Sequence, residues 1–172
     1  AILYHSAITD PLTSLYSHRH FQLESDQLLR RAARTQSPIS LMILDLDHFK
    51  KLNDQFGHEA GNVCLKRISE ILKNKFRVTD VIARFGGDEF EILLPDATTE
   101  KCLEIAEALN EQIRVQDFPL QITGTIGIAT YPHNALDSQS LFLAADQALY
   151  IGKKKGRNCV TVSTITVKND HI

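Results

Sequence analysis

Three acidic residues stand where apolar runs of the sequence end or turn. Asp45 lies near the end of the apolar run 39–46, and Asp88 and Glu89 lie between the runs 81–85 and 90–94. In neighbouring strands these carboxylates would converge, and a cation would relieve their repulsion. Oxygen ligands favour Mg²⁺ or Mn²⁺, which also bind substrate phosphates. The pattern therefore indicates phosphate chemistry at a metal site. Each piece alone is more typical of a solvated turn or a helix cap, and only their combination makes a metal site an equal alternative.

Gly86 and Gly87 precede these two acids and separate two short apolar runs. Such a pair predicts a hairpin turn. The absence of side chains at both positions also leaves the backbone open to a ligand.

The surrounding pattern predicts the elements that must position these groups. Short apolar runs predict strands, and apolar residues at helical spacing predict helices. Strands are expected at 39–46, 81–85, 90–94, 122–130 and from 159 to 162, and helices at 17–36, 48–56, 59–76, 98–113 and 141–151. This order predicts an α+β fold of the ferredoxin-like type, with a central, mostly antiparallel five-stranded sheet flanked by helices.

Composition narrows the class of protein. The chain has 172 residues, a net charge of -2 and 43% hydrophobic residues, which is ordinary for one globular domain and excludes a disordered chain or a membrane bundle. The near-neutral charge argues against a DNA-binding protein. Three widely spaced cysteines without a CxxC pattern predict reduced thiols in a cytoplasmic domain.

The ends of the chain predict its organisation. It begins AILYHSAITD, without an initiator Met, so we expect residues 1–9 to be the remnant of an upstream linker or helix. The domain itself is expected at 10–163 and a C-terminal tail at 164–172. An upstream sensor or dimerisation domain is expected in the full-length protein, and the sequence leaves open whether that protein is attached to a membrane.

The motifs, taken in order, resemble one family. The string GGDEF stands at 86–90 within RFGGDEFEILLP, and it is accompanied by DPLTSLYSHRHF (10–21), LMILDLDHFKKLNDQFGHEAGN (41–62), TIGIAT (125–130) and ADQALYIGKKKGRN (145–158). The chain thus resembles a GGDEF domain, the catalytic domain of bacterial diguanylate cyclases. The resemblance implies the palm fold of nucleotide cyclases and condensation of two GTP into cyclic di-GMP, with release of two pyrophosphates.

The resemblance also implies roles for individual residues. Asp45, Asp88 and the backbone carbonyl of Leu46 would bind the divalent metals. Glu89 would be a further ligand or the base near the attacking 3′-hydroxyl. Phosphate and substrate binding would fall to Phe49 (through its backbone amide), Lys50, His58, Lys153, Arg157, Gly86 and Gly87, and base recognition to Asn53 and Asn62. Asp47 and Asp54 are expected to support the turn, and Lys154 and Lys155 to be surface residues.

Asn62 departs from the family, which usually has Asp in this place. Guanine presents two adjacent donors, which a carboxylate matches and an amide matches only in part. One hypothesis is therefore weakened selectivity for GTP, with some use of ATP. The alternative, which we favour, is that Asn53 and the rest of the pocket still select guanine.

Arg77 and Asp80 form an RxxD string shortly before the hairpin. Such a pair is often only a surface ion pair, but here it resembles the family's inhibitory site for cyclic di-GMP. One nucleotide per chain implies a two-fold homodimer for catalysis. A signalling module that binds GTP or cyclic di-GMP without turnover is the alternative function, and a palm with another substrate lacks motifs of its own.

Overall fold

A computed structural model describes residues 8–168 of the chain, and the predicted linker at 1–9 therefore lies mostly outside the described residues. The elements in chain order are β1 (Tyr16–Ser17), α2 (His18–Thr35), β2 (Ile39–Asp47), α3 (Phe49–Phe56), α4 (His58–Lys75), β3 (Val81–Gly86), β4 (Glu89–Pro95), α5 (Thr99–Arg114), β5 (Thr123–Tyr131), α6 (Ser138–Lys154) and β6 (Val160–Val162). None of the helices in this described part is long and apolar enough to cross a membrane.

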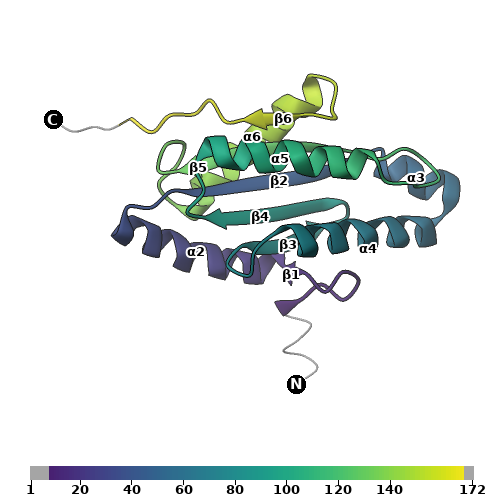
Figure 1. Cartoon of the computed structure of the whole chain (residues 1–172), viewed down its shortest axis with the longest axis horizontal. Helices are drawn as coiled ribbons and strands as arrows, with labels where there is room; N and C mark the ends of the chain where they lie inside the picture. The colour runs from purple at the N-terminus through teal and green to yellow at the C-terminus, as the bar shows by residue number, and fades with distance from the viewer. Residues whose placement is uncertain (1–7, 169–172) are drawn as a thin grey trace.

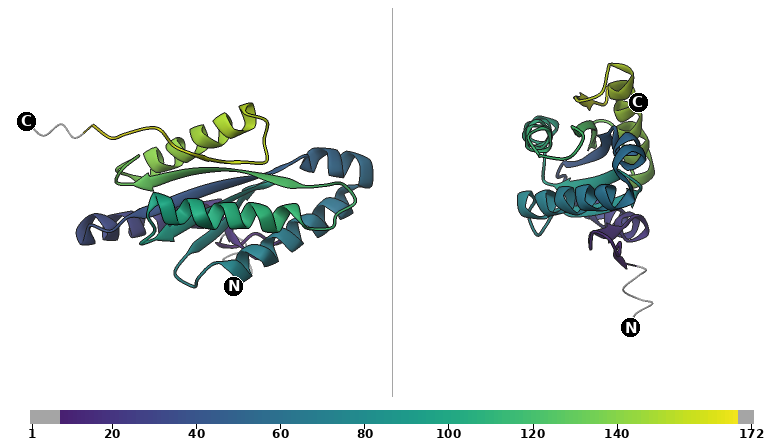
Figure 2. Two further views of the ribbon diagram at one scale, coloured as in Figure 1. Left: turned by 45° about the horizontal axis from the view of Figure 1, so that its top comes forward. Right: turned by 90° about the vertical axis from the view of Figure 1, so that its right-hand side faces the viewer.

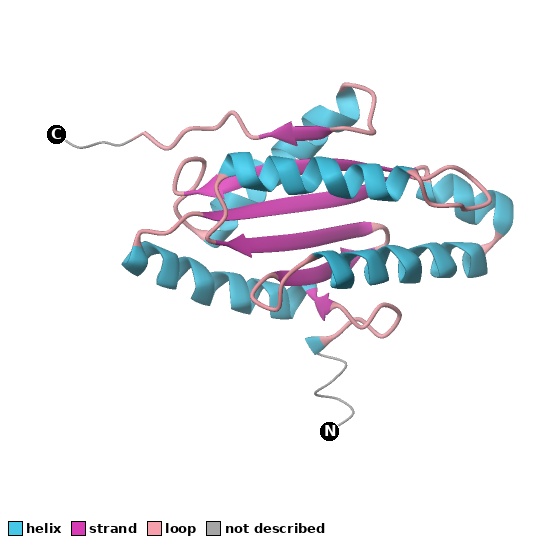
Figure 3. Cartoon of the chain, viewed as in Figure 1, coloured by secondary structure: helices cyan, strands magenta, loops and turns pink. Residues whose placement is uncertain are grey.

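One mixed sheet forms the centre of the molecule, with the strand order β1-β3-β4-β2-β5-β6 (Figures 1 and 3). The middle strands β3-β4-β2-β5 are antiparallel to one another, in the ferredoxin-like order, which confirms the predicted fold class. The predicted number of five strands was wrong, because β1 adds a sixth strand parallel to β3. A strand of two residues is too short to show the alternation from which strands are predicted.

The starts of α2, α5 and α6 follow local side-chain capping. The Ser17 side chain accepts a hydrogen bond from the His20 amide at the start of α2, and the Thr98 side chain accepts one from the Lys101 amide at the start of α5. Both positions agree with the predicted helix starts. The prediction for α6 began three residues late, because a capping box between Asp137 and Ser140 starts that helix before its first buried residue.

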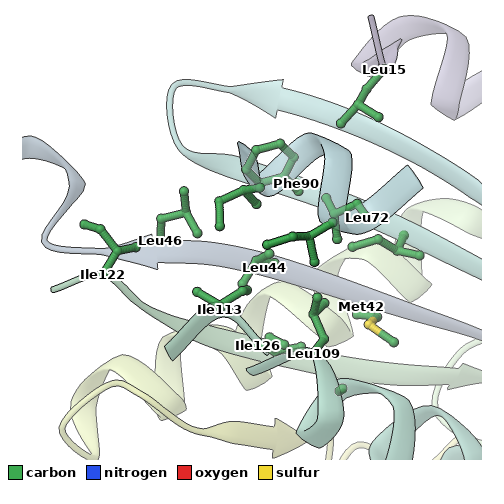
Figure 4. Close-up of a cluster of buried hydrophobic side chains, with 14 of the residues drawn as sticks. Leu15, Met42, Leu44, Leu46, Leu72, Phe90, Leu109, Ile113, Ile122 and Ile126 are labelled. Carbon is green, nitrogen blue, oxygen red and sulfur yellow. The ribbon is translucent and has the colours of Figure 1, made fainter. Parts of the chain in front are cut away.

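Two apolar layers enclose the sheet. Even-numbered residues of β2 face α4 and α5, and odd-numbered ones face α2 and α6, as the two-residue period of a strand requires. Figure 2 shows helices on both sides of the sheet. Figure 4 shows part of the first layer, which includes Met42, Leu44, Leu46, Leu72, Phe90, Leu109 and Ile113. Asp45 and Asp47, being odd-numbered, share the face of β2 that is covered by α6.

The contact between α6 and the sheet depends on Gly127 of β5. A Cβ atom at this position would lie 2.2 Å from the Ala145 carbonyl oxygen and 2.4 Å from the Leu149 amide nitrogen. Only glycine permits so close an approach. This packing fixes the C-terminal end of α6, and therefore Lys153, relative to the end of β2.

Candidate functional site

The acidic turn between β3 and β4 lies against the C-terminal end of β2 (Figure 1). Asp45 of β2 is in register with Glu89 of β4, and the Leu46 amide donates to the Asp88 carbonyl oxygen at 3.1 Å. The fold therefore brings together the three acidic residues that the sequence singled out, although Asp45 lies 43 positions before Asp88 in the chain.

The two acids of the turn are held in an environment that disfavours their charge. Burial, and next the charge of Asp45, raises the pKa of Asp88 to about 6. Burial, and then Asp45 and Asp146, raises the pKa of Glu89 to about 7. Lys153 opposes both effects. Carboxyl groups with such perturbed pKa values are typical of functional sites, and a bound cation would favour their ionised forms.

Lys153 of α6 forms an ion pair with Asp45 through Oδ2. The other carboxylate oxygen of Asp45, Oδ1, is buried and has no hydrogen-bond partner. A buried acceptor without a donor is costly, and a metal ion is one group that would satisfy it. The structure thus shows unused ligating capacity at the position where the sequence predicts a metal.

The available donors suit a hard cation that shares its ligands with a substrate. No three His, Cys, Asp or Glu side chains within residues 8–168 form a ready-made ligand cluster. An ion bound by the Asp45 and Asp88 carboxylates and the Leu46 carbonyl would therefore complete its shell with water or phosphate oxygens. Mg²⁺ and Mn²⁺ commonly bind in this way, so the residues present fit the predicted group.

A pocket lined by both acidic and basic residues opens at Asp45 and Asp88. It has a volume of about 420 Å³, and the residues that line it include Asp45, Leu46, Phe49, Lys50, Asp88 and Arg157. Phe49 is the first residue of α3, whose N-terminus has no side-chain cap, so its first amides are available to an anion. The structure therefore brings most of the predicted metal and phosphate residues to one pocket.

The predicted base-recognition residues lie where α3 meets α4. Asn53 Oδ1 is buried without a partner, and a Cβ atom on Gly61 would lie 1.9 Å from it. Gly61 is therefore the residue that lets the Asn53 side chain lie between the two helices. Asn62 is half-buried, and His58 is exposed at the start of α4.

The two glycines of the turn differ in what they require. Neither has an atom within 4 Å of the place where a Cβ would lie, but Gly87 has a φ of +52°, which L-residues rarely adopt. Backbone conformation therefore favours glycine at 87, and the space beside both positions is open.

Arg77 and Asp80 lie before β3, at the opposite end of that strand from the acidic turn. Asp80 accepts from the Arg77 amide at 2.8 Å and from its guanidinium at 3.1 Å, and the guanidinium also donates to the Pro95 carbonyl oxygen. The Asp80 side chain is 3% exposed and that of Arg77 63% exposed. The pair thus presents an arginine at the surface, beside a second pocket of about 320 Å³.

The sequence did not lead us to predict the residue whose hydrogen bonds hold the acidic turn. Arg84 donates to the Gly87 carbonyl oxygen through Nε at 3.0 Å and Nη2 at 2.8 Å, and through Nη1 to Asp10 at 3.2 Å. An arginine two residues before the Gly-Gly turn was the available signal. It links the N-terminal segment to the peptide that precedes Asp88.

A buried pair behind the turn was missed as well. Glu91, two residues after Glu89 on the same face of β4, has its Oε2 2.9 Å from His18 Nδ1. Phe85 lies against the His18 ring, with the ring centroids 4.2 Å apart. A charged residue inside the apolar run 90–94 was the signal for this pair.

Comparison with known proteins gives one family. The model described as "Diguanylate cyclase, GGDEF domain" matches residues 7–159. Diguanylate cyclase DgcP of Pseudomonas aeruginosa is 40% identical over 162 residues, which cover 91% of this chain and 24% of DgcP. Response regulator PleD of Caulobacter vibrioides is 33% identical over 161 residues, which cover 90% of this chain and 36% of PleD. The chain thus spans well under half the length of these relatives.

Comparison with solved structures gives the same family. The GGDEF domain of DgcB from Caulobacter crescentus, in complex with c-di-GMP, superimposes with a TM-score of 0.85 at 28% identity, over 91% of this chain and 95% of that one. The GGDEF domain of TpbB (YfiN) from Pseudomonas aeruginosa gives 0.86 at 34% identity, over 91% and 95% of the two chains. Together with the fold and the acidic turn, these matches show that the chain belongs to the GGDEF-domain family of diguanylate cyclases.

Proposed function

We propose that this domain condenses two molecules of GTP into cyclic di-GMP. The observation that carries the proposal is the meeting of Asp45 with Asp88 and Glu89 beside Lys153, next to a pocket lined by Lys50 and Arg157. In each of two steps a 3′-oxygen forms a bond to the α-phosphorus of the other nucleotide, and the bond from that phosphorus to pyrophosphate breaks.

In this proposal basic residues bind the triphosphate, and acidic residues bind the metal ion and accept the proton. Lys50, Lys153 and Arg157 bind the triphosphate, together with the first amides of α3. Glu89, which lies opposite Asp45 in the register of β4 and β2, accepts the proton of the attacking 3′-hydroxyl. Asp45, Asp88 and the Leu46 carbonyl would hold Mg²⁺ (or Mn²⁺), which would supply activation of the attacking oxygen and charge neutralisation of the leaving group.

Catalysis in this proposal requires two copies of the chain. One nucleotide per chain supplies half of a two-fold symmetric product, so two sites must face each other in a homodimer. We propose that residues 10–163 form the catalytic domain, that it works in the cytoplasm, and that an upstream sensor or dimerisation domain brings two copies together. The family match over 7–159 supports the domain bounds.

Mass spectrometry of reaction products tests the proposed activity. The chain is incubated with GTP, with ATP and with both, in the presence of Mg²⁺ and at concentrations that span its self-association. Asp88→Ala should abolish product, whereas Asp117→Ala, at an exposed aspartate far along the sequence from the turn, should not. Binding of GTP without any product would instead support the signalling module without turnover.

Asn62 is the position at which we propose a test of selectivity. The half-buried amide matches only one of the two adjacent donors of guanine, and a mismatch costs about 1–3 kcal/mol, or roughly tenfold to a hundredfold in affinity. Asn62→Asp should therefore lower the KM for GTP. An unchanged KM supports the alternative that we favour, in which Asn53 and the rest of the pocket select guanine.

Arg77 and Asp80 are proposed as the inhibitory site for the product. The exposed guanidinium of Arg77 is available to a phosphate or a guanine edge, while Asp80 holds its backbone in place. Arg77→Ala should relieve inhibition by cyclic di-GMP. Unchanged inhibition would show that the pair is an ordinary surface ion pair.

A further inference from the structure

Asp47, the last residue of β2, has a buried carboxylate, and both of its oxygens accept hydrogen bonds from other residues of the chain. Its Oδ2 accepts from the Thr123 hydroxyl at 2.7 Å and from the Asn158 amide at 3.0 Å. Its Oδ1 accepts from the Thr125 hydroxyl at 2.7 Å. The nearest cation is the Arg157 guanidinium, at 3.9 Å from Oδ1. These bonds join the end of β2 to β5 and to the loop that follows α6.

That loop has an unfavourable backbone conformation. Gly156, Arg157 and Asn158 have φ values of 119°, 68° and 48°. Two consecutive residues other than glycine in the left-handed region persist only where the surroundings hold them. The loop therefore needs an anchor.

Two sets of hydrogen bonds supply the anchor at Asn158. Its amide lies 3.0 Å from Asp47 Oδ2 and 3.1 Å from the Thr125 hydroxyl. Its side-chain oxygen accepts from Arg114 Nε at 3.2 Å and Nη2 at 3.0 Å. Asn158 is thus held on both its backbone and its side chain. The adjoining Arg157 side chain remains 46% exposed and lines the pocket of about 420 Å³ that opens at Asp45 and Asp88.

We propose that Asp47 is a positioning residue for triphosphate binding: it fixes the 156–158 loop so that the Arg157 guanidinium faces the pocket. The inference rests on the proposed function, because it assumes that Arg157 binds the triphosphate of GTP. Asp47 binds neither metal nor substrate in this account. It acts on the substrate only through Arg157.

Asp47→Asn tests the inference while keeping the size of the side chain. The amide retains one acceptor oxygen where the carboxylate has two. If the oxygen of the new side chain faces the Asn158 amide, its NH2 group faces the Thr125 hydroxyl, which can rotate and accept. The bond to the Asn158 amide then remains, but it loses the negative charge that strengthens it. The loop should therefore lose part of its anchor.

Equilibrium binding of 3′-deoxy-GTP is the assay, because this analogue keeps the triphosphate and lacks the hydroxyl that would react. Asp47→Asn should weaken binding by about tenfold, as expected when charge-assisted hydrogen bonds are lost, and Arg157→Ala by a similar factor. The double variant should bind no more weakly than the weaker of the two single variants, because both changes remove the same contribution, that of Arg157 to triphosphate binding. Thr123→Val removes a bond on the β5 side alone and should have the smaller effect.

The outcomes separate the inference from its premise. Full additivity of the two changes, or unchanged binding by Asp47→Asn, overturns the positioning role, since a merely structural loss would act independently of Arg157. If the unaltered chain fails to bind 3′-deoxy-GTP, or Arg157→Ala binds it normally, the premise fails and the inference with it. If Asp47→Asn does not fold, Thr125→Val tests the same link, because that hydroxyl contacts both Asp47 and the Asn158 amide.

Discussion

Replacing Glu91 by glutamine should stabilise the domain at neutral and alkaline pH. The Glu91 side chain is fully buried, its Oε2 is 2.9 Å from His18 Nδ1, and its Oε1 has no partner. Burial raises the pKa of Glu91 to about 8, and burial also lowers the pKa of His18. Both shifts favour uncharged forms. At pH values below about 8 we therefore expect a neutral hydrogen bond from the Glu91 carboxyl group to His18 rather than an ion pair.

The size of the effect follows from proton linkage. Unfolded Glu91 ionises near its ordinary pKa of 4.5, and the folded form near 8. Below pH 4.5 Glu91 is protonated in both the folded and the unfolded state, so its ionisation does not lower the free energy of unfolding. Between these values folding requires the carboxyl group to take up a proton, so stability falls by about 1.4 kcal/mol per pH unit, or about 5 kcal/mol in all. This total is an upper bound, because any local opening that hydrates Glu91 lowers it.

Glu91→Gln removes this dependence with little change in shape. The glutamine amide can donate to His18 Nδ1 as the protonated acid does, and it has no charge to lose. The difference in unfolding free energy between the variant and the original chain should therefore grow in favour of the variant from pH 4.5 to pH 8 and then stay constant.

Urea denaturation at pH 5, 6.5, 8 and 9 measures that difference. Titrating groups that do not interact with Glu91, including Asp88, contribute equally to both proteins and cancel in the comparison. The Glu91 charge also raises the pKa of Glu89, but it is the smallest of the causes of that shift. Glu107→Gln, at an exposed position of α5, is the matched control and should give a difference that does not vary with pH. A constant difference for Glu91→Gln as well would refute the reasoning, since it would mean that Glu91 is ionised in the folded protein.

Three further substitutions test contacts that position the site. Arg84→Lys cannot reproduce the two hydrogen bonds to the Gly87 carbonyl oxygen, so kcat for product formation should fall by about tenfold or more. The control is Arg67→Lys, which alters a hydrogen bond to a surface carbonyl group and should leave kcat unchanged. Gly127→Ala places a Cβ within 2.4 Å of α6 backbone atoms and should lower the unfolding free energy by about 1–3 kcal/mol in urea denaturation; an unaltered midpoint would contradict the packing argument. Gly61→Ala should displace the Asn53 side chain and weaken GTP binding, measured by calorimetry, and normal affinity would show that this asparagine does not contact the base.

Much of the fold could be predicted from the sequence because its signals are local. The apolar run of β2 and the Gly-Gly turn between β3 and β4 predicted their own elements, and the ferredoxin-like order then placed Asp45 beside the turn, as the register of Asp45 with Glu89 confirms. The two-residue strand β1 could not be predicted, because so short a segment carries no period.

The contacts of the site were less predictable because they depend on packing between distant elements. Lys153 reaches Asp45 only because Gly127 allows α6 to lie directly on β5, and no property of a single segment shows this. The pairing of Arg84 with the turn and with Asp10 likewise needs three segments in place. The metal and phosphate roles came from family resemblance, and spacing alone would have left a solvated turn as an equal alternative.

Asp45 and Asp47 show why two acidic residues on one face of a strand can have different roles. Both are odd-numbered residues of β2 and face α6, so neither composition nor alternation distinguishes them. Asp47 accepts from two hydroxyls and an amide, which leaves it little capacity for a metal. Asp45 has one lysine partner and a buried oxygen without a donor. The carboxylate that the protein leaves unsatisfied is the one suited to bind a cation, and the carboxylate that it satisfies is the one suited to hold a loop.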